Sequence, residues 1–170
     1  MADAGAVQAH YSTNLVLEDI VRALKDAGVE LDQLTPLELA PVDQFHSRGL
    51  DATKELGEIL SPKAEEHLLD IGCGLGGPAR FFAFSHGCRV DGIDLTPAFC
   101  ETARQLTAMT GLGDLVSIEC ASALDLPFED EGFDAAYSQN VVMNIADKAA
   151  FYGEARRVLK AGGRLALSNL

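Results

Sequence analysis

Residues 69–77 read LDIGCGLGG, an aspartate closely followed by four glycines within six positions. Glycine loses more conformational freedom on folding than any other residue, so such a cluster needs a structural or functional reason. The preceding run HLLDI (67–71) is typical of a buried strand, and PARFFAFSHG (78–87) is predicted to be a helix with Pro78 in its first turn. The glycines therefore lie in a strand-to-helix turn, which is explained either by tight packing alone or by the close approach of a ligand.

The rest of the chain continues this alternation of strands and helices. One helix is expected from Pro97 to about residue 110, with Thr96 as its cap, and another over 147–160. Further strands are expected over 89–94, 115–120, 133–139 and 164–170. Strands that alternate with helices imply right-handed crossovers and a parallel sheet. The predicted fold class is therefore α/β, a doubly wound, Rossmann-like parallel sheet with helices on both faces. Such sheets bind ligands at the carboxyl ends of their strands, where the glycine cluster lies.

The first sixty residues are expected to be mainly helical. Apolar residues recur at helical spacing over 17–24, and Gly28 is placed to end that helix. The segment LTPLELAPVDQF (34–45) contains Pro36 and Pro41, so it is expected to be an ordered loop and not a continuous helix.

Composition excludes several classes of protein. The 170 residues suffice for one domain, and no apolar run approaches the roughly 18 residues of a membrane span. A net charge of −13 disfavours nucleic acid as a partner, because an acidic surface repels phosphate backbones. The N-terminus lacks the features of a signal peptide, so a cytoplasmic protein is expected. The four cysteines form no C-x-x-C pair, which predicts reduced cysteines and no metal site.

Asp94 ends the second expected strand, 22 residues after Gly72. An acid at about this distance, at the tip of the second strand, can accept hydrogen bonds from both hydroxyls of a ribose. The alternative role for Asp94 is to cap the following helix, for which Thr96 is better placed. Because nicotinamide dinucleotides and S-adenosylmethionine both contain an adenosine ribose, Asp94 alone does not separate them.

The glycine loop and Asp70 help to separate these two cofactors. The loop contains both G-x-G-x-G (Gly72, Gly74, Gly76) and the dehydrogenase spacing G-x-G-x-x-G, which uses Gly77. A carboxylate at Asp70 is unfavourable beside a pyrophosphate but suits the ammonium group of a cationic cofactor. The residues thus favour S-adenosylmethionine. An NAD(P)-dependent oxidoreductase and a non-catalytic cofactor-binding relative remain the alternatives.

Four segments together resemble the successive motifs of class I S-adenosylmethionine-dependent methyltransferases, in the methyltransferase type 11 branch that acts on small molecules. They are HLLDIGCGLGG, VDGIDLT, LDLPFEDEGFDAAYSQNVVMNI and EARRVLKAGGRLAL, which follow one another between residues 67 and 167. The resemblance implies transfer of a methyl group to a small-molecule acceptor by in-line displacement. It also implies an N-terminal helical cap over 1–62 and a cofactor-binding domain over 63–170.

The resemblance assigns residues to each part of the cofactor. They are Asp70, Gly72, Cys73, Gly74 and Gly76 for the methionine part and its loop, Asp94 for the ribose, Leu95, Ser122 and Ala123 for the adenine, and Ser138, Gln139 and Asn140 beside the methionine carboxylate and methyl group. Tyr11 is a candidate lid residue, with a half-buried surface aromatic as the alternative. His46 and Arg48 are candidates for the substrate side, with loop anchors as the alternative. No residue has the neighbours of a general base, so no catalytic residue is assigned.

Besides Asn144, which stands where the family often has a histidine, the sequence departs from the family's pattern at two places. Ser122 stands where the family usually has an aspartate that binds the adenine amino group, which predicts weaker cofactor binding. The chain also stops in the expected fifth strand, whereas the family's sheet has seven, so strands six and seven are expected to be absent here and the chain is expected to be part of a longer protein. The edge left open favours association between copies, and a homodimer is one such assembly.

Overall fold

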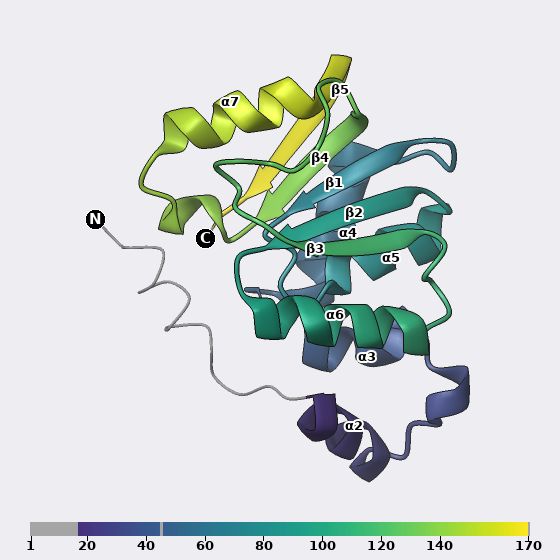
Figure 1. Cartoon of the computed structure of the whole chain (residues 1–170). Helices are drawn as coiled ribbons and strands as arrows, with labels where there is room; N and C mark the ends of the chain where they lie inside the picture. The colour runs from purple at the N-terminus through teal and green to yellow at the C-terminus, as the bar shows by residue number, and fades with distance from the viewer. Residues whose placement is uncertain (1–16, 45, 170) are drawn as a thin grey trace.

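The computed structural model describes residues 17–44 and 46–169, and a five-stranded sheet lies at its centre (Figure 1). The strand order is β3-β2-β1-β4-β5, and every neighbouring pair is parallel. The order reverses between β1 and β4, which confirms the predicted doubly wound, Rossmann-like sheet. The strands are β1 (His67–Ile71), β2 (Arg89–Asp94), β3 (Val116–Cys120), β4 (Phe133–Gln139) and β5 (Leu159–Ser168).

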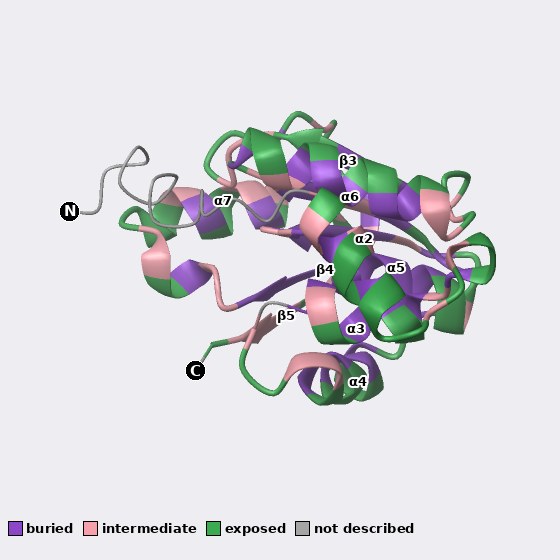
Figure 2. Ribbon diagram, turned by 90° about the horizontal axis from the view of Figure 1, so that it is seen from below, coloured by how far each residue is buried: buried purple, intermediate pink, exposed green. Residues whose placement is uncertain are grey.

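Helices cover both faces of the sheet. One face packs against α4 (Gly49–Leu60), α5 (Gly77–His86) and α6 (Pro97–Met109), and the other against α7 (Lys148–Val158), so the central strands β1 and β4 are mostly buried (Figure 2). Leu56 and Leu60 of α4 share the core cluster of α5 and the strands. The predicted division of the chain at residue 62 stays a prediction, and α4 belongs by its packing to the layer against the sheet.

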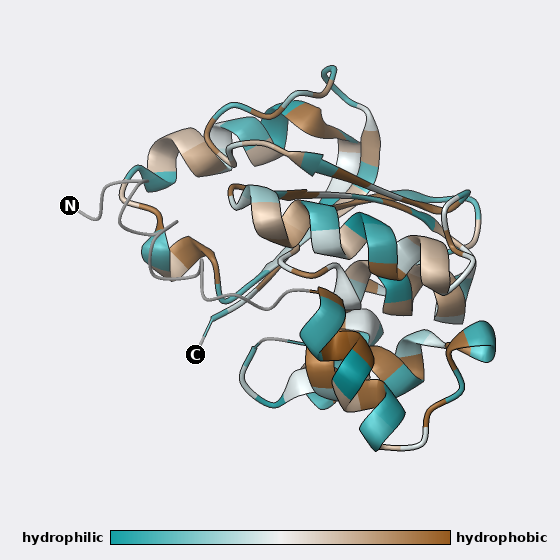
Figure 3. Ribbon diagram, turned by 60° about the horizontal axis from the view of Figure 1, so that its bottom comes forward, coloured by the Kyte–Doolittle hydropathy of each residue, from teal (hydrophilic) through white to brown (hydrophobic). Residues whose placement is uncertain are grey.

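The N-terminal helices form a separate apolar cluster. The helices α2 (Leu17–Asp26), η1 (Leu31–Gln33) and α3 (Pro36–Asp43) pack against α6 and against Leu75 of the glycine loop. Figure 3 shows both hydrophobic and hydrophilic stretches on α2, as expected of an amphipathic helix that covers a core. These helices (α2, η1 and α3), called the cap below, therefore contact the loop that follows β1 directly.

The expectation that residues 34–45 form a loop is wrong, because α3 is a helix with Pro41 inside it. Thr35 and Glu38 form a capping box at its start, and Pro36 occupies the first turn, where its missing N–H is harmless. Pro41 removes only the hydrogen bond to Leu37, whose side chain is exposed. A good cap and the burial of the opposite face outweigh this loss over eight residues.

Two further local expectations need correction. Thr96 stands at the N-terminal boundary of α6, but its side chain makes no capping hydrogen bond; the backbone amide of Thr96 instead donates to Asp94. The last helix ends at Val158 and not at residue 160, because Leu159 already pairs with Phe133 at the start of β5. The register then shifts through a bulge, and regular pairing resumes with Arg164 opposite Ala135.

No helix within residues 17–44 and 46–169 is long and apolar enough to cross a membrane.

Candidate functional site

The loops that follow β1 and β4 meet at the point where the strand order reverses. A Cβ atom on Gly72 would lie 2.3 Å from Cγ2 of Val141, so the two loops are in close contact. Gly72 also has a φ of +88°, a conformation that side chains disfavour. Contact with the neighbouring loop therefore explains this first glycine without a ligand.

The other loop glycines have different neighbours. A Cβ atom on Gly77 would lie 2.7 Å from the carbonyl oxygen of Asp43, and one on Gly76 would lie 3.0 Å from a guanidinium nitrogen of Arg80. No described atom lies within 4 Å of the corresponding position on Gly74. Protein packing thus accounts for Gly72, Gly76 and Gly77, whereas Gly74 faces open space that a ligand can occupy.

Asp94 joins the tip of β2 to the glycine loop. Its Oδ2 accepts a 2.9 Å hydrogen bond from the amide of Gly74, and its Oδ1 accepts one of 2.9 Å from the amide of Thr96. A carboxylate offers about four lone-pair positions, so two remain after these bonds are made. The geometry therefore permits Asp94 to shape the loop and to bind two ribose hydroxyls at once.

Asp70 is buried beneath the loop, with only 2% of its surface exposed. Its Oδ2 is buried and makes no hydrogen bond within the described part of the chain. Burial, and to a lesser extent the charge of Asp94, raises the pKa of Asp70 to about 8, although the nearby Tyr137 hydroxyl lowers it. A buried carboxyl that has no cationic partner among the described residues suits a cationic group brought by a ligand, such as an ammonium.

The residues that end β4 have mixed roles. Ser138 is fully buried and donates a 2.6 Å hydrogen bond to the carbonyl of Ile71, which ties β4 to β1. Asn140 adopts the left-handed conformation, and its backbone amide donates a hydrogen bond to the carbonyl of Ser168. Gln139 lies 3.3 Å from Thr53 through Oε1, and its buried Nε2 has no partner among the described residues. Gln139 therefore has a buried side-chain donor that the described structure leaves unused.

The residues assigned to the adenine lie beside Asp94. The amide of Ala121 donates to the carbonyl of Asp94, which brings the start of the segment after β3 next to β2. Ser122 follows in a tight turn, where its Oγ accepts a 3.1 Å hydrogen bond from the amide of Leu124. Ala123 is partly buried beside the same turn, and Leu95 keeps 37% of its surface exposed. The Ser122 hydroxyl therefore already accepts one hydrogen bond, and the side chain carries no charge.

The candidate lid and substrate residues are separated. Tyr11 lies outside the described residues. His46 reaches a polar cluster, with its Nε2 3.0 Å from Oε1 of Gln44 and 3.1 Å from Oγ1 of Thr53, and burial lowers its pKa. Arg48 instead forms a two-point ion pair with Glu55 on the surface, with distances of 2.8 and 2.5 Å. His46 is thus connected through Thr53 to Gln139, whereas Arg48 is engaged at the protein surface.

The Cys73 thiol is buried, and burial raises its pKa well above its usual value. A Cβ atom on Gly92 of β2 would lie 3.0 Å from Sγ of Cys73, so the thiol packs closely against β2. All four cysteines are free. The position of Cys73 indicates a packing role beneath the loop.

Comparison with known proteins agrees with this arrangement. A family model described as "Methyltransferase domain" matches residues 69–167, which is more than half of the chain. The chain belongs to this methyltransferase family. The match includes the glycine loop, Asp94 and the residues that end β4.

Individual relatives are similar over different lengths. An O-methyltransferase of Aspergillus sclerotiorum is 32% identical over 99% of this chain and 61% of its own length. A sarcosine/dimethylglycine N-methyltransferase of Halorhodospira halochloris is 32% identical over 72% of this chain and 43% of its own length. Among solved structures, a geranyl diphosphate methyltransferase in complex with S-adenosylmethionine is 29% identical, with a TM-score of 0.65 over 68% of this chain and 46% of that one. The methyltransferase chain thus spans less than two thirds of these relatives.

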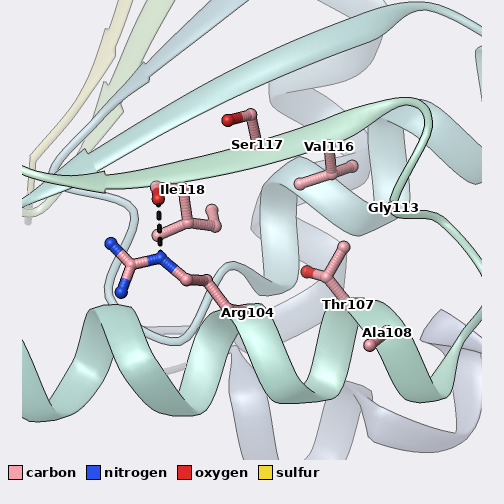
Figure 4. Close-up of a pocket in the computed structure, with 7 residues that line it drawn as sticks. All are labelled: Arg104, Thr107, Ala108, Gly113, Val116, Ser117 and Ile118. Atoms are coloured by element: carbon pink, nitrogen blue, oxygen red, sulfur yellow. Dashed lines mark hydrogen bonds between the residues drawn. The ribbon is translucent and has the colours of Figure 1, made fainter.

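One pocket of the methyltransferase domain lies away from this site. It has a volume of about 280 Å³ between α6 and the first half of β3, and Arg104 crosses it to donate a 2.9 Å hydrogen bond to Ile118 (Figure 4). Its other lining residues are Thr107, Ala108, Gly113, Val116 and Ser117. Because these residues lie toward the opposite end of the sheet from Asp94, the pocket is separate from the glycine loop. Within the described ranges, no three His, Cys, Asp or Glu side chains are grouped as metal ligands.

Sequence analysis missed several residues that shape the site of the methyltransferase domain. Arg80 and Asp43 form a fully buried ion pair beneath the glycine loop, and Leu75 is buried in the cap cluster. Thr53 connects His46 to Gln139. An arginine in a predicted amphipathic helix gives no sequence signal of burial, so only the three-dimensional arrangement shows these contacts.

Proposed function

We propose that the protein transfers the methyl group of S-adenosylmethionine to a small-molecule acceptor by in-line displacement. The observation that carries this proposal is the buried carboxyl of Asp70, which has no cationic partner among the described residues, beneath the open position at Gly74. A cationic amino-acid group is the ligand that such a carboxylate needs, and S-adenosylmethionine carries one. Membership of the methyltransferase family supports the same cofactor.

The residues of the chain fit the three parts of this cofactor. The two free lone-pair positions of Asp94 suit the ribose hydroxyls, and the turn at Ser122 suits the edge of the adenine. Asp70 suits the ammonium group, and Gly74 leaves space for the methionine part. When bound, the cofactor supplies an electrophilic methyl carbon on its sulfonium. The chain then has to hold an acceptor in line with that carbon and exclude water, which gives several kcal/mol of entropic advantage.

Gln139 and His46 are the residues that we place on the acceptor side. They are linked through the buried Thr53, and Gln139 ends β4 beside the point where the strand order reverses. The relatives named for sarcosine/dimethylglycine and for geranyl diphosphate support an acceptor of small size. No residue is assigned as a general base, so an amine that arrives deprotonated needs the least help from this chain.

The alternative of a nicotinamide-dependent oxidoreductase has less support. A dinucleotide would bring a pyrophosphate to the loop above Asp70 and has no ammonium group to pair with the ionised form of that carboxyl. The relatives described above are methyltransferases. The other alternative is a non-catalytic relative that only binds the cofactor, and a measurement of turnover distinguishes it from an enzyme.

The test is transfer of a labelled methyl group. The protein is incubated with methyl-labelled S-adenosylmethionine and separate panels of amines, phenols and carbon acids, and both S-adenosylhomocysteine and labelled product are measured. We expect product from one panel, which is lost in Asp94→Ala and kept in Asp114→Ala, an exposed carboxylate in the turn before β3. Cofactor binding without label transfer to any acceptor would favour the non-catalytic alternative.

A further inference from the structure

Arg80 and Asp43 form an ion pair whose side chains are both fully buried. Nη2 of Arg80 lies 2.8 Å from Oδ2 of Asp43, which joins the first turns of α5 to the end of α3. The pair is incompletely satisfied, because Oδ1 of Asp43 and Nε of Arg80 have no hydrogen-bond partner within residues 17–44 and 46–169. Burial also raises the pKa of Asp43, against the opposing effect of Arg80. Such a pair is weak evidence for stability, since removing two charges from water offsets much of their attraction.

The same guanidinium holds the glycine loop. Nη2 of Arg80 donates a 2.6 Å hydrogen bond to the carbonyl of Leu75, which stands between Gly74 and Gly76. Nη1 donates to the carbonyl of Ala103 and to the hydroxyl of Thr107 in α6, both at 3.1 Å. One side chain therefore fixes the loop, the cap and α6 relative to one another. Leu75 contributes a second connection, because its side chain is buried in the cap cluster.

The loop is consequently held from two sides. Asp94 at the tip of β2 accepts from the amide of Gly74, and Arg80 donates to the carbonyl of Leu75 from below. These two contacts fix the orientation of the peptide group before Gly74 and of the one after Leu75. Gly74 is the position that faces open space, so its orientation decides how a ligand meets the loop.

Asp43 extends the effect of Arg80 to the end of β4. The next residue, Gln44, accepts a 2.7 Å hydrogen bond from the buried hydroxyl of Thr53, which also lies 3.3 Å from Gln139. Asp43 also packs closely against Gly77, since its carbonyl oxygen lies 2.7 Å from the position that a Cβ on Gly77 would take. The position of Asp43 thus sets where the segment from Gln44 to Thr53 begins.

We propose that Arg80, through Asp43 and the carbonyl of Leu75, is a positioning residue that holds the glycine loop and the cap in the arrangement that binds the cofactor. It acts through these groups and does not contact the cofactor. The inference rests on the proposed function. It differs from a purely structural role, in which the pair would only stabilise the fold.

A matched set of variants separates these two roles. Asp43→Leu alone leaves the Arg80 charge buried without its partner and is expected to lower the Tm by about 10 °C or more. The double variant R80M/D43L replaces the pair by apolar side chains and is expected to recover a Tm close to that of the wild type. Its affinity for S-adenosylhomocysteine is nevertheless expected to fall about tenfold or more, because the Leu75 carbonyl has lost its donor. Wild-type affinity in a stable double variant would overturn the proposal.

Arg80→Lys covers the case in which the double variant does not fold. A lysine keeps the charge but not the fork of donors that reaches Asp43 and Leu75 together. We expect its affinity for S-adenosylhomocysteine to fall about fivefold or more, and hydrogen exchange of the Gly74 and Gly76 amides to become faster. Arg104→Lys, an arginine that also donates to a backbone carbonyl in the same face of the domain, is the control that should change neither. Unchanged loop exchange and affinity in Arg80→Lys would overturn the proposal.

The hydrogen-exchange measurement needs no ligand. If the wild type does not bind S-adenosylhomocysteine, the proposed function fails. Faster loop exchange in Arg80→Lys, with no change in Arg104→Lys, would still support the positioning of the loop by Arg80.

Discussion

Oδ2 of Asp94 accepts a 2.9 Å hydrogen bond from the amide of Gly74, so the acid at the tip of β2 holds the glycine loop that follows β1. The other oxygen accepts from Thr96, which the sequence had suggested as the cap of α6. The two readings of Asp94, ribose binding and a local backbone contact, are therefore compatible. A carboxylate has enough lone pairs for both.

Asp94→Ala is expected to reduce the affinity for S-adenosylhomocysteine about 100-fold, since it removes the ribose acceptor and one restraint on the loop. The Tm should fall by only a few degrees, because one net backbone hydrogen bond contributes about 1 kcal/mol. Calorimetric titration and thermal unfolding measure the two effects. Asp114→Ala is the matched control, and a loss of affinity in both variants would argue against a specific role of Asp94.

Asp70 predicts an unusual pH dependence of stability. Its pKa is about 8 in the folded protein and near 3.8 in the unfolded chain, so the folded state holds the proton between these values. The free energy of unfolding should therefore fall as pH rises from about 4 to 8, by up to roughly 1.4 kcal/mol per pH unit from this group. Asp70→Asn should remove this part of the slope in denaturant titrations at several pH values. An unchanged slope would mean that Asp70 is ionised throughout.

The same group predicts a pH dependence of cofactor binding. An ammonium beside Asp70 favours the ionised carboxylate, so the affinity for S-adenosylhomocysteine should rise with pH up to about 8, by at most about tenfold per unit. Asp94, Tyr137 and Cys73 surround Asp70 and are kept in the comparison. In Asp70→Asn the affinity should be lower and nearly independent of pH over this range. A wild-type affinity that falls with pH would contradict the assignment.

The glycines of the loop should respond differently to alanine. Gly72→Ala places a methyl group 2.3 Å from Val141 in a strained backbone conformation, so we expect a loss of more than about 2 kcal/mol of stability. Gly74→Ala meets no described neighbour and should cost about 1–2 kcal/mol through its φ of +54°, while cofactor affinity falls about tenfold or more. Unfolding curves and titrations measure both. The double variant G72A/V141A should recover part of the lost stability if the clash is the cause.

Ser122→Asp is expected to raise the affinity for S-adenosylhomocysteine by about three- to tenfold. A carboxylate can still accept from the Leu124 amide and offers a charge-assisted bond to the adenine amino group. The inosine analogue, which lacks that amino group, is the control ligand and should show no gain. An equal gain with both ligands would point to a general electrostatic effect.

The alternation of strands and helices was enough to predict the sheet, and the hydrogen bond between Gly74 and Asp94 brings the glycine loop and the acid together at the predicted ligand site, which stays a prediction. Local sequence rules failed in α3, where Pro41 disfavours a helix. The capping box of Thr35 and Glu38 and the burial of one helix face outweigh that unfavourable effect. Long-range contacts left no pattern in the sequence. Arg80 and Asp43 are 37 positions apart, and neither residue type predicts complete burial. The functional roles of individual site residues stay predictions.

The most direct test of the account is calorimetric titration of the 170-residue chain with S-adenosylhomocysteine, with NADH as the comparison ligand and circular dichroism as the check on folding. We predict saturable binding of S-adenosylhomocysteine at one site, loss of that binding in Asp94→Ala, and no binding of NADH. A folded sample that binds NADH, or that fails to bind S-adenosylhomocysteine, would contradict the claim that the glycine loop, Asp70 and Asp94 of this chain hold S-adenosylmethionine.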